Sequence, residues 1–223
     1  GDSDFAAGST ALGVEWHSAA DFLADGLKMS ASFSTDNGAV KNETARLENS
    51  WGIGATYVTT AGDTTVTVGG GIADGEIANT GGQSSSDKGG FNLGVSAVTG
   101  DLTIGVGYGD GDSFVPASAG VAASGSATNI EIDGSVMKAG VSYVTGDLTL
   151  ALGITAGEAK DSGTFGTPGT TDDSTDSTSA SVTYAVASGV SAVLGYTSVD
   201  RKNNGSTSTL DGTAWYVGAT MSF

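Results

Sequence analysis

The sequence predicts an all-β fold, a transmembrane antiparallel β-barrel, from three observations. The C-terminal segment 213–223 alternates apolar residues with small or polar ones and ends on an aromatic ring, as a strand with one apolar face does. Comparable alternating segments recur along the whole chain. Short turns and long polar connections join them in alternation, which is the layout of an outer-membrane barrel.

Alternation predicts eleven strands in order along the chain. They span residues 10–17, 27–35, 50–59, 64–73, 89–98, 101–109, 135–144, 147–156, 178–187, 190–199 and 213–223. The short turns 60–63, 99–101, 145–147 and 188–189 contain Gly with Asp or Ser, which suits tight hairpins. The segment 18–26 takes the place of a short turn but is longer. The long connections are expected at 36–49, 74–88, 110–134, 157–177 and 200–212.

Composition bounds the class of protein. A length of 223 residues suits one β-barrel domain over 1–223. The chain has no cysteine, which excludes disulfides and thiolate chemistry. It has no run of about 18 apolar residues, so no membrane-spanning helix is predicted. The formal net charge of −17 argues against a nucleic-acid partner, because phosphate binding needs clustered Lys and Arg.

The two faces of the predicted strands differ in a way that favours a membrane. Segment 147–156, for example, places Leu148, Leu150 and Leu152 on one face and Thr149 and Gly153 on the other. A soluble sheet would carry many Lys and Glu on its wet face. Here the second face is mostly Gly, Ser and Thr, as in the lining of a water-filled lumen.

Aromatic residues on the apolar face gather at both strand ends, which predicts two interfacial belts. The belt near the short turns consists of Trp16, Tyr57, Tyr143, Tyr184 and Phe223; the belt near the long connections consists of Phe33, Trp51, Phe91, Tyr108, Tyr196 and Trp215. They lie roughly 20–26 Å apart along a strand. The alternative is that aromatics simply favour strand ends in any β protein.

The strand count has a consequence for topology. The last strand runs toward the short turns, so Phe223 is expected at the periplasmic end and strand 10–17 starts outside. Bacterial single-chain barrels have an even number of strands with both ends inside. Eleven strands therefore predict further strands before residue 10, or a weak strand within 1–8. We favour the first, with this chain as the C-terminal portion of a longer barrel.

The Thr-Gly-Asp-Leu turns, the Gly/Ser/Thr lining, the acidic connections and the ending Trp215–Phe223 resemble the general porins of alphaproteobacteria, the Rhodobacter-type family. The resemblance implies a 16-stranded barrel in the Gram-negative outer membrane, assembled as a homotrimer, whose third outer loop narrows the pore. Residues 1–9 would be the tail of that constriction loop, and five strands would precede them.

Polar residues on the lining face are the candidate functional side chains. Those expected to line the pore are Glu15, His17, Lys28, Lys138 and Arg46. Opposed charges across a pore sort solutes by charge. A locally paired charge without effect on transport is the alternative. The chain has no Cys and no Ser-His-Asp pattern that converges on His17, so no enzyme is predicted.

The acidic connections suggest two further partners. Asp110 and Asp112 in Gly109–Ser113 are a weak candidate for loop-bound Ca²⁺, although a solvated acidic loop without a metal explains them better. Together the acids are expected to attract cations at the outer mouth and to bridge to lipopolysaccharide through divalent ions. No other cofactor is expected.

The predicted function is passive diffusion of small hydrophilic solutes and ions through the barrel, with a preference for cations. One alternative is a structural or adhesive barrel that acts through its acidic loops. A soluble Gly/Asp-rich adhesin or Ca²⁺-binding solenoid is another, but its nonapeptide repeats are missing from the sequence.

Overall fold

The computed structural model of the chain describes residues 12–36, 45–79, 86–115, 130–161, 172–202 and 209–221. These residues form eleven β-strands. The strands are β1 (Leu12–His17), β2 (Leu27–Asp36), β3 (Ala45–Ala61), β4 (Thr64–Asn79), β5 (Ser86–Thr99), β6 (Leu102–Val115), β7 (Ile130–Thr145), β8 (Leu148–Asp161), β9 (Asp172–Ala187), β10 (Val190–Lys202) and β11 (Thr209–Met221). In these ranges no helix is long and apolar enough to cross a bilayer.

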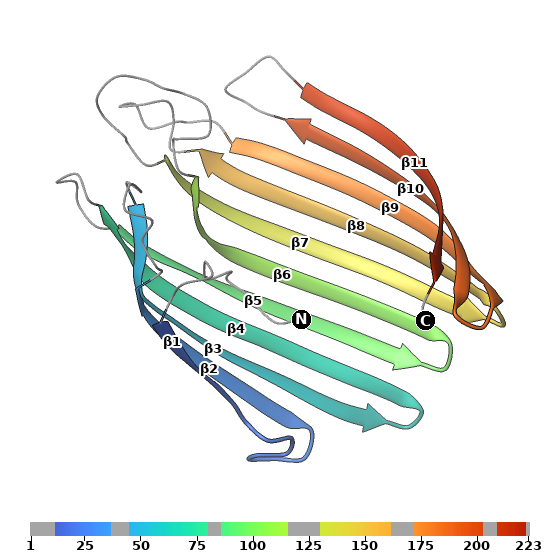
Figure 1. Ribbon diagram of the computed structural model, residues 1–223, viewed down its shortest axis with the longest axis horizontal. Coiled ribbons are helices and arrows are strands. Elements are labelled where there is room, and N and C mark those ends of the chain that lie inside the picture. The colour runs from blue at the N-terminus through green and yellow to red at the C-terminus, as the bar shows by residue number, and fades with distance from the viewer. Residues whose placement is uncertain are drawn as a thin grey trace.

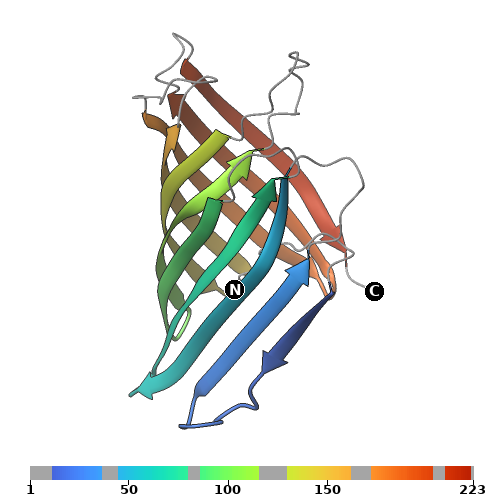
Figure 2. The ribbon, with the colours of Figure 1, turned by 90° about the vertical axis from the view of Figure 1, so that its left-hand side faces the viewer.

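Each strand pairs with the next one along the chain, always antiparallel, in a single sheet ordered β1 to β11 (Figure 1). The sheet curls, so that the N-terminal strands lie in front of the C-terminal strands in the perpendicular view (Figure 2). In the described part of the chain β1 and β11 do not pair, so both are open edges. All eleven predicted strands are therefore confirmed, in the predicted order and antiparallel.

The pairing register carries the apolar face from one side of the sheet to the other. Ala31 lies opposite Ile53, and Ile53 opposite Ile72. In the C-terminal half, Leu194 lies opposite both Val182 and Val217. Because side chains alternate with a period of two, a slip of one residue at any pair would break this continuity.

The sheet has no interior core among the described residues. None of their large side chains is fully buried, and apolar residues of the continuous face are widely exposed, with Leu152 at 50% and Val217 at 84%. A soluble monomer rarely exposes an apolar surface of this extent. The apolar face is therefore built to be covered by an apolar medium.

The short turns have the predicted chemistry. Gly62, Gly100, Gly146 and Gly189 all have positive φ, between 55° and 75°. Glycine adopts this conformation without a steric penalty. The four tight hairpins are thus confirmed.

At the opposite end the strands run further than expected. The segment expected at 50–59 is part of a strand that starts at Ala45, and the one expected at 101–109 continues to Val115. Apolar alternation stops where the sequence turns polar, but pairing continues because neighbouring backbones still satisfy each other's hydrogen bonds. Much of each predicted long connection is therefore strand, and the predicted boundaries at this end are wrong.

On the polar face, an aromatic ring of β11 covers a glycine of β10. Tyr216 on β11 lies directly opposite Gly195 on β10. A Cβ atom added at Gly195 would overlap the Tyr216 ring, and Gly195 is buried. The ring therefore lies on the bare backbone of the glycine, in the manner of an aromatic side chain that shields a glycine in a strand.

We expect Gly195→Ala to displace the Tyr216 ring and to lower the free energy of unfolding by about 1 kcal/mol, near the low end for overpacking because the ring can rotate. Denaturant unfolding of the folded barrel, followed by tryptophan fluorescence, measures the change.

The matched control is Gly218→Ala, since nothing lies within 4 Å of a Cβ added at that glycine. In the double variant Gly195→Ala/Tyr216→Ala, the free energy of unfolding should fall by less than the sum of the losses in the two single variants. Additive losses would show that the ring and the glycine are not coupled.

Candidate functional site

The polar face lines a concave space of about 730 Å³ that extends over β3 to β9. Its polar side chains come from alternate positions of neighbouring strands, among them Thr56, Asn92, Ser96 and Lys138. Most residues of this face over β3 to β9 are less exposed than the apolar residues between them, although Asn92 and Lys138 are exposed.

Glycines from neighbouring strands meet on this inner face. Gly94 lies opposite both Gly69 and Gly107, and Gly140 lies opposite both Gly105 and Gly153. With no side chain at these positions the wall is smooth, and its backbone is accessible to solvent-sized molecules. Such a wall presents few side chains that could bind a solute.

Glu15 and His17, both predicted to line the pore, lie two residues apart on the inner face of β1. The Nε2 atom of His17 lies 2.8 Å from Oε1 of Glu15, and both side chains are mostly exposed, at 62% and 66%. An exposed pair of this kind is strongly screened by solvent and adds little stability. His17 therefore has a local polar partner in Glu15.

Lys28 and Lys138 also lie on the inner face. Lys28 is opposite Thr56, and Lys138 lies between Gly107 and Thr155. Within the described residues the only ion pair is that of Glu15 and His17, so neither ammonium group is neutralised there. Both therefore contribute positive charge to the inner face.

Arg46 was predicted in a connection that enters the third strand. Its backbone instead belongs to β3, opposite Ala78. Its side chain lies outside the described residues.

The aromatic side chains on the apolar face occupy two levels. Toward the long connections, Phe33 lies opposite Trp51, the Tyr196 and Trp215 rings are 4.7 Å apart, and the Phe91 and Tyr108 rings are 5.8 Å apart. Toward the short turns lie Trp16, Tyr57, Tyr143 and Tyr184, which are 42% to 50% exposed. Phe223 lies outside the described residues.

Two aromatic residues lie outside the two predicted belts. Phe22, inside the long turn 18–26, packs edge-on against Trp16 with ring centroids 5.5 Å apart. Tyr216 adds an aromatic ring to the inner face. The alternation along 213–223 predicts the face of Tyr216, but a turn carries no such periodicity, so the sequence could not have placed Phe22.

The acids predicted in the long connections are found on strands where the structure describes them. Six acids, Asp74, Asp110, Glu158, Asp176, Asp200 and Asp211, occupy positions on the same side of the sheet as the apolar face, at or beyond the level of its aromatic residues. Asp74 lies opposite Trp51, and Asp110 lies opposite Phe91. Asp200 lies opposite both Asp176 and Asp211. These described acids therefore form an outward-facing rim on strands rather than in loops.

The predicted loop around Asp110 and Asp112 is also strand, whereas Ca²⁺ at these residues stays a prediction. Gly109–Ser113 belongs to β6, where an extended backbone spaces Asp110 and Asp112 by about 7 Å. The hydroxyl of Tyr108 donates a hydrogen bond of 3.1 Å to Oδ2 of Asp110. No described cluster of three or more acidic, His or Cys side chains could hold a metal ion.

Comparison with known proteins adds a family and a fold. A family model described as Gram-negative porin matches residues 16–204. The comparison with curated proteins finds no match. Several solved structures are similar to the chain.

OmpT, expressed in the outer membrane of Vibrio cholerae, is 19% identical with a TM-score of 0.53, over 94% of this chain and 64% of that one. The outer membrane channel DcaP of Acinetobacter baumannii is 11% identical with a TM-score of 0.60, over 92% and 62%. A porin refined at 1.8 Å is 18% identical with a TM-score of 0.56, over 94% and 60%. These similarities show the fold, an outer-membrane β-barrel, and the chain spans less than two thirds of each structure.

The face assignment can be tested with single cysteines, because the chain has none of its own. In a lipid bilayer we expect Asn92→Cys and Lys138→Cys to react with a charged, water-soluble thiol reagent. Their sequence neighbours Leu93→Cys and Met137→Cys, which project from the apolar face, should react at least tenfold more slowly because thiolates do not form in hydrocarbon. Mass spectrometry measures the modified fraction, and equal rates within a pair would refute the assignment.

Proposed function

Because this chain belongs to the Gram-negative porin family, we propose that it forms the wall of a water-filled channel for small hydrophilic solutes and ions. The protein resides in the outer membrane. One observation carries the proposal: a register that keeps one face apolar over eleven strands and the other face small and polar. Such a wall separates lipid from water, and transport along it is passive and needs no catalysis.

A closed lumen requires strands beyond these eleven. β1 and β11 are both open edges and run in the same direction, so they cannot join as an antiparallel pair. We propose that an odd number of further strands completes the barrel, since unpaired edges are not tolerated in lipid. The number is five if the complete barrel has the 16 strands that the resemblance implies.

We propose that the protein assembles as a homotrimer, because it resembles the general porins of alphaproteobacteria. Membership of that narrower family stays a prediction. The outward rim of Asp176, Asp200 and Asp211 lies beyond the aromatic Tyr196 and Trp215, where lipid headgroups would begin. Acids placed opposite one another repel, so we propose that divalent cations such as Ca²⁺ relieve the repulsion and bridge to lipopolysaccharide phosphates.

Ion preference is set by two opposing groups of charges. The net charge of −17 and the acidic rim favour cations, whereas Lys28 and Lys138 on the inner wall favour anions. We propose a net preference for cations. These fields fall off over about 8–10 Å at ionic strengths of 0.1–0.15 M, so the preference should be strongest in dilute salt.

The channel itself is tested by conductance. The native outer-membrane protein, purified and added to a planar lipid bilayer, should produce discrete current steps that grow in proportion to salt concentration. Heat-denatured protein is the control. An absence of steps from folded protein would exclude the channel and leave a structural or adhesive role.

The opposing charges make a separate prediction. We expect Lys138→Glu to raise the cation-to-anion permeability ratio, measured as a reversal potential across a salt gradient, severalfold in dilute salt and by much less near 1 M, because salt screens the wall charge. The matched control is Asp147→Asn in a short turn, which removes a charge away from the inner wall. An unchanged ratio for Lys138→Glu would show that this residue does not face the ion path.

A further inference from the structure

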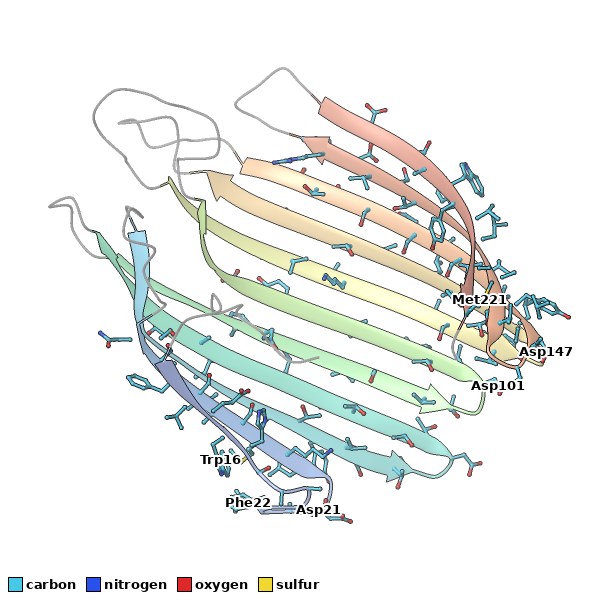
Figure 3. The ribbon with its side chains drawn as sticks, viewed as in Figure 1. Trp16, Asp21, Phe22, Asp101, Asp147 and Met221 are labelled. Atoms are coloured by element: carbon cyan, nitrogen blue, oxygen red, sulfur yellow. The ribbon has the colours of Figure 1, made fainter. Side chains whose placement is uncertain are left out.

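The β1–β2 turn, residues 18–26, differs from the other four turns at the same end of the sheet. Those four have only Gly, Asp or Ser at their tips, including Asp101 and Asp147 (Figure 3). The β1–β2 turn instead exposes Phe22 at 52% and Leu23 at 69%. An exposed apolar pair at one turn out of five requires a physical explanation.

The turn is a defined structure. The Gly26 amide donates a 2.6 Å hydrogen bond to Oδ1 of Asp21, and the Leu27 amide donates to the carbonyl oxygen of Ala24 at 3.0 Å. At its base the Ser18 amide donates to the carbonyl of Met29 at 2.8 Å, and the Met29 amide donates to the Ser18 hydroxyl at 2.8 Å. Phe22 and Leu23 are thus held in place before anything binds them.

Gly26 fixes the turn against the neighbouring hairpin. Its φ is +79°, and its carbonyl oxygen accepts a 2.9 Å hydrogen bond from the Val58 amide. A Cβ at this position would overlap the Val58 carbonyl oxygen. The turn is therefore anchored on β3 as well as on its own strands.

The direction of the turn follows from Phe22. Its ring packs edge-on against Trp16, which lies on the apolar face opposite Ala31 (Figure 3). The turn therefore extends the apolar, lipid-facing surface beyond the end of β1. A rigid apolar patch that is continuous with a lipid-facing surface binds lipid at a small cost in conformational entropy.

We propose that the β1–β2 turn is a membrane anchor that places Phe22 and Leu23 in the interface of the periplasmic leaflet. The acids of the same turn limit how deeply Phe22 and Leu23 enter the membrane. Asp21 and Asp25 are exposed, and carboxylates are costly in hydrocarbon, so the patch lies among headgroups and upper acyl chains. The proposal rests on the outer-membrane location and the apolar face, and does not depend on channel activity.

Depth-dependent quenching tests the anchor. The chain has three tryptophans, Trp16, Trp51 and Trp215, and replacing all three by Phe leaves a dark background. Into it, Phe22→Trp and Leu23→Trp are introduced separately, with Asp101→Trp at a polar turn as the water-exposed control and Leu152→Trp as the lipid-facing control. Each protein is folded into phosphatidylcholine vesicles with bromines at defined acyl-chain depths.

Both turn probes should be quenched by lipids brominated near the headgroup more than by deep bromines, and aqueous iodide should quench them at least threefold less than the Asp101→Trp probe. Iodide quenching equal to that of the control would overturn the proposal and place the turn in water. Protection from iodide and bromine alike would also overturn it, in favour of contact with a second copy of the chain.

A second probe position and a parallel conductance measurement separate a local disturbance from a failure of the anchor. If Phe22→Trp disturbs the contact with residue 16, Leu23→Trp still reports from a side chain that is mostly exposed and has room for the indole. Conductance of each variant is recorded in parallel. Loss of channel steps with retained lipid quenching would count against the proposed channel and not against the anchor.

Discussion

The hydrogen-bonded ladder between neighbouring strands is the constraint on which the other features of this structure depend. Hydrocarbon offers no hydrogen bonds, so each backbone amide and carbonyl of the spanning segment must find its partner in the next strand. That requirement holds the strands in one sheet and fixes the register of each pair. The register then decides which side chains meet lipid, because alternate residues point to opposite faces.

The absence of an interior core among the described residues follows from this constraint. A soluble domain gains stability by burying apolar side chains against each other, whereas this sheet turns them outward and exposes the larger ones. The inner face is therefore free of packing demands, which permits the runs of opposed glycines such as Gly140 and Gly153. A smooth inner wall and an apolar outer wall are two results of one register.

Charge is distributed according to the same geometry. Described acids such as Asp176, Asp200 and Asp211 stand on the outward rim, while Lys28 and Lys138 stand on the inner wall. Net charge by itself would have assigned one sign to the whole surface. Register instead places the two signs at different positions, acids on the outward rim and lysines on the inner wall.

The sequence by itself determined the number, order and antiparallel pairing of the strands, the tight turns at Gly62 and Gly100, and the faces of residues such as Lys138. Period-two alternation and turn glycines are local signals, and they suffice for local features. Only the tertiary structure decided how far β3 and β6 run past the apolar band, that Gly109–Ser113 is strand, that Tyr216 covers Gly195, and that Phe22 reaches Trp16. Each of these depends on a backbone or side chain contributed by another segment, and no periodicity within one segment records which neighbour it will meet.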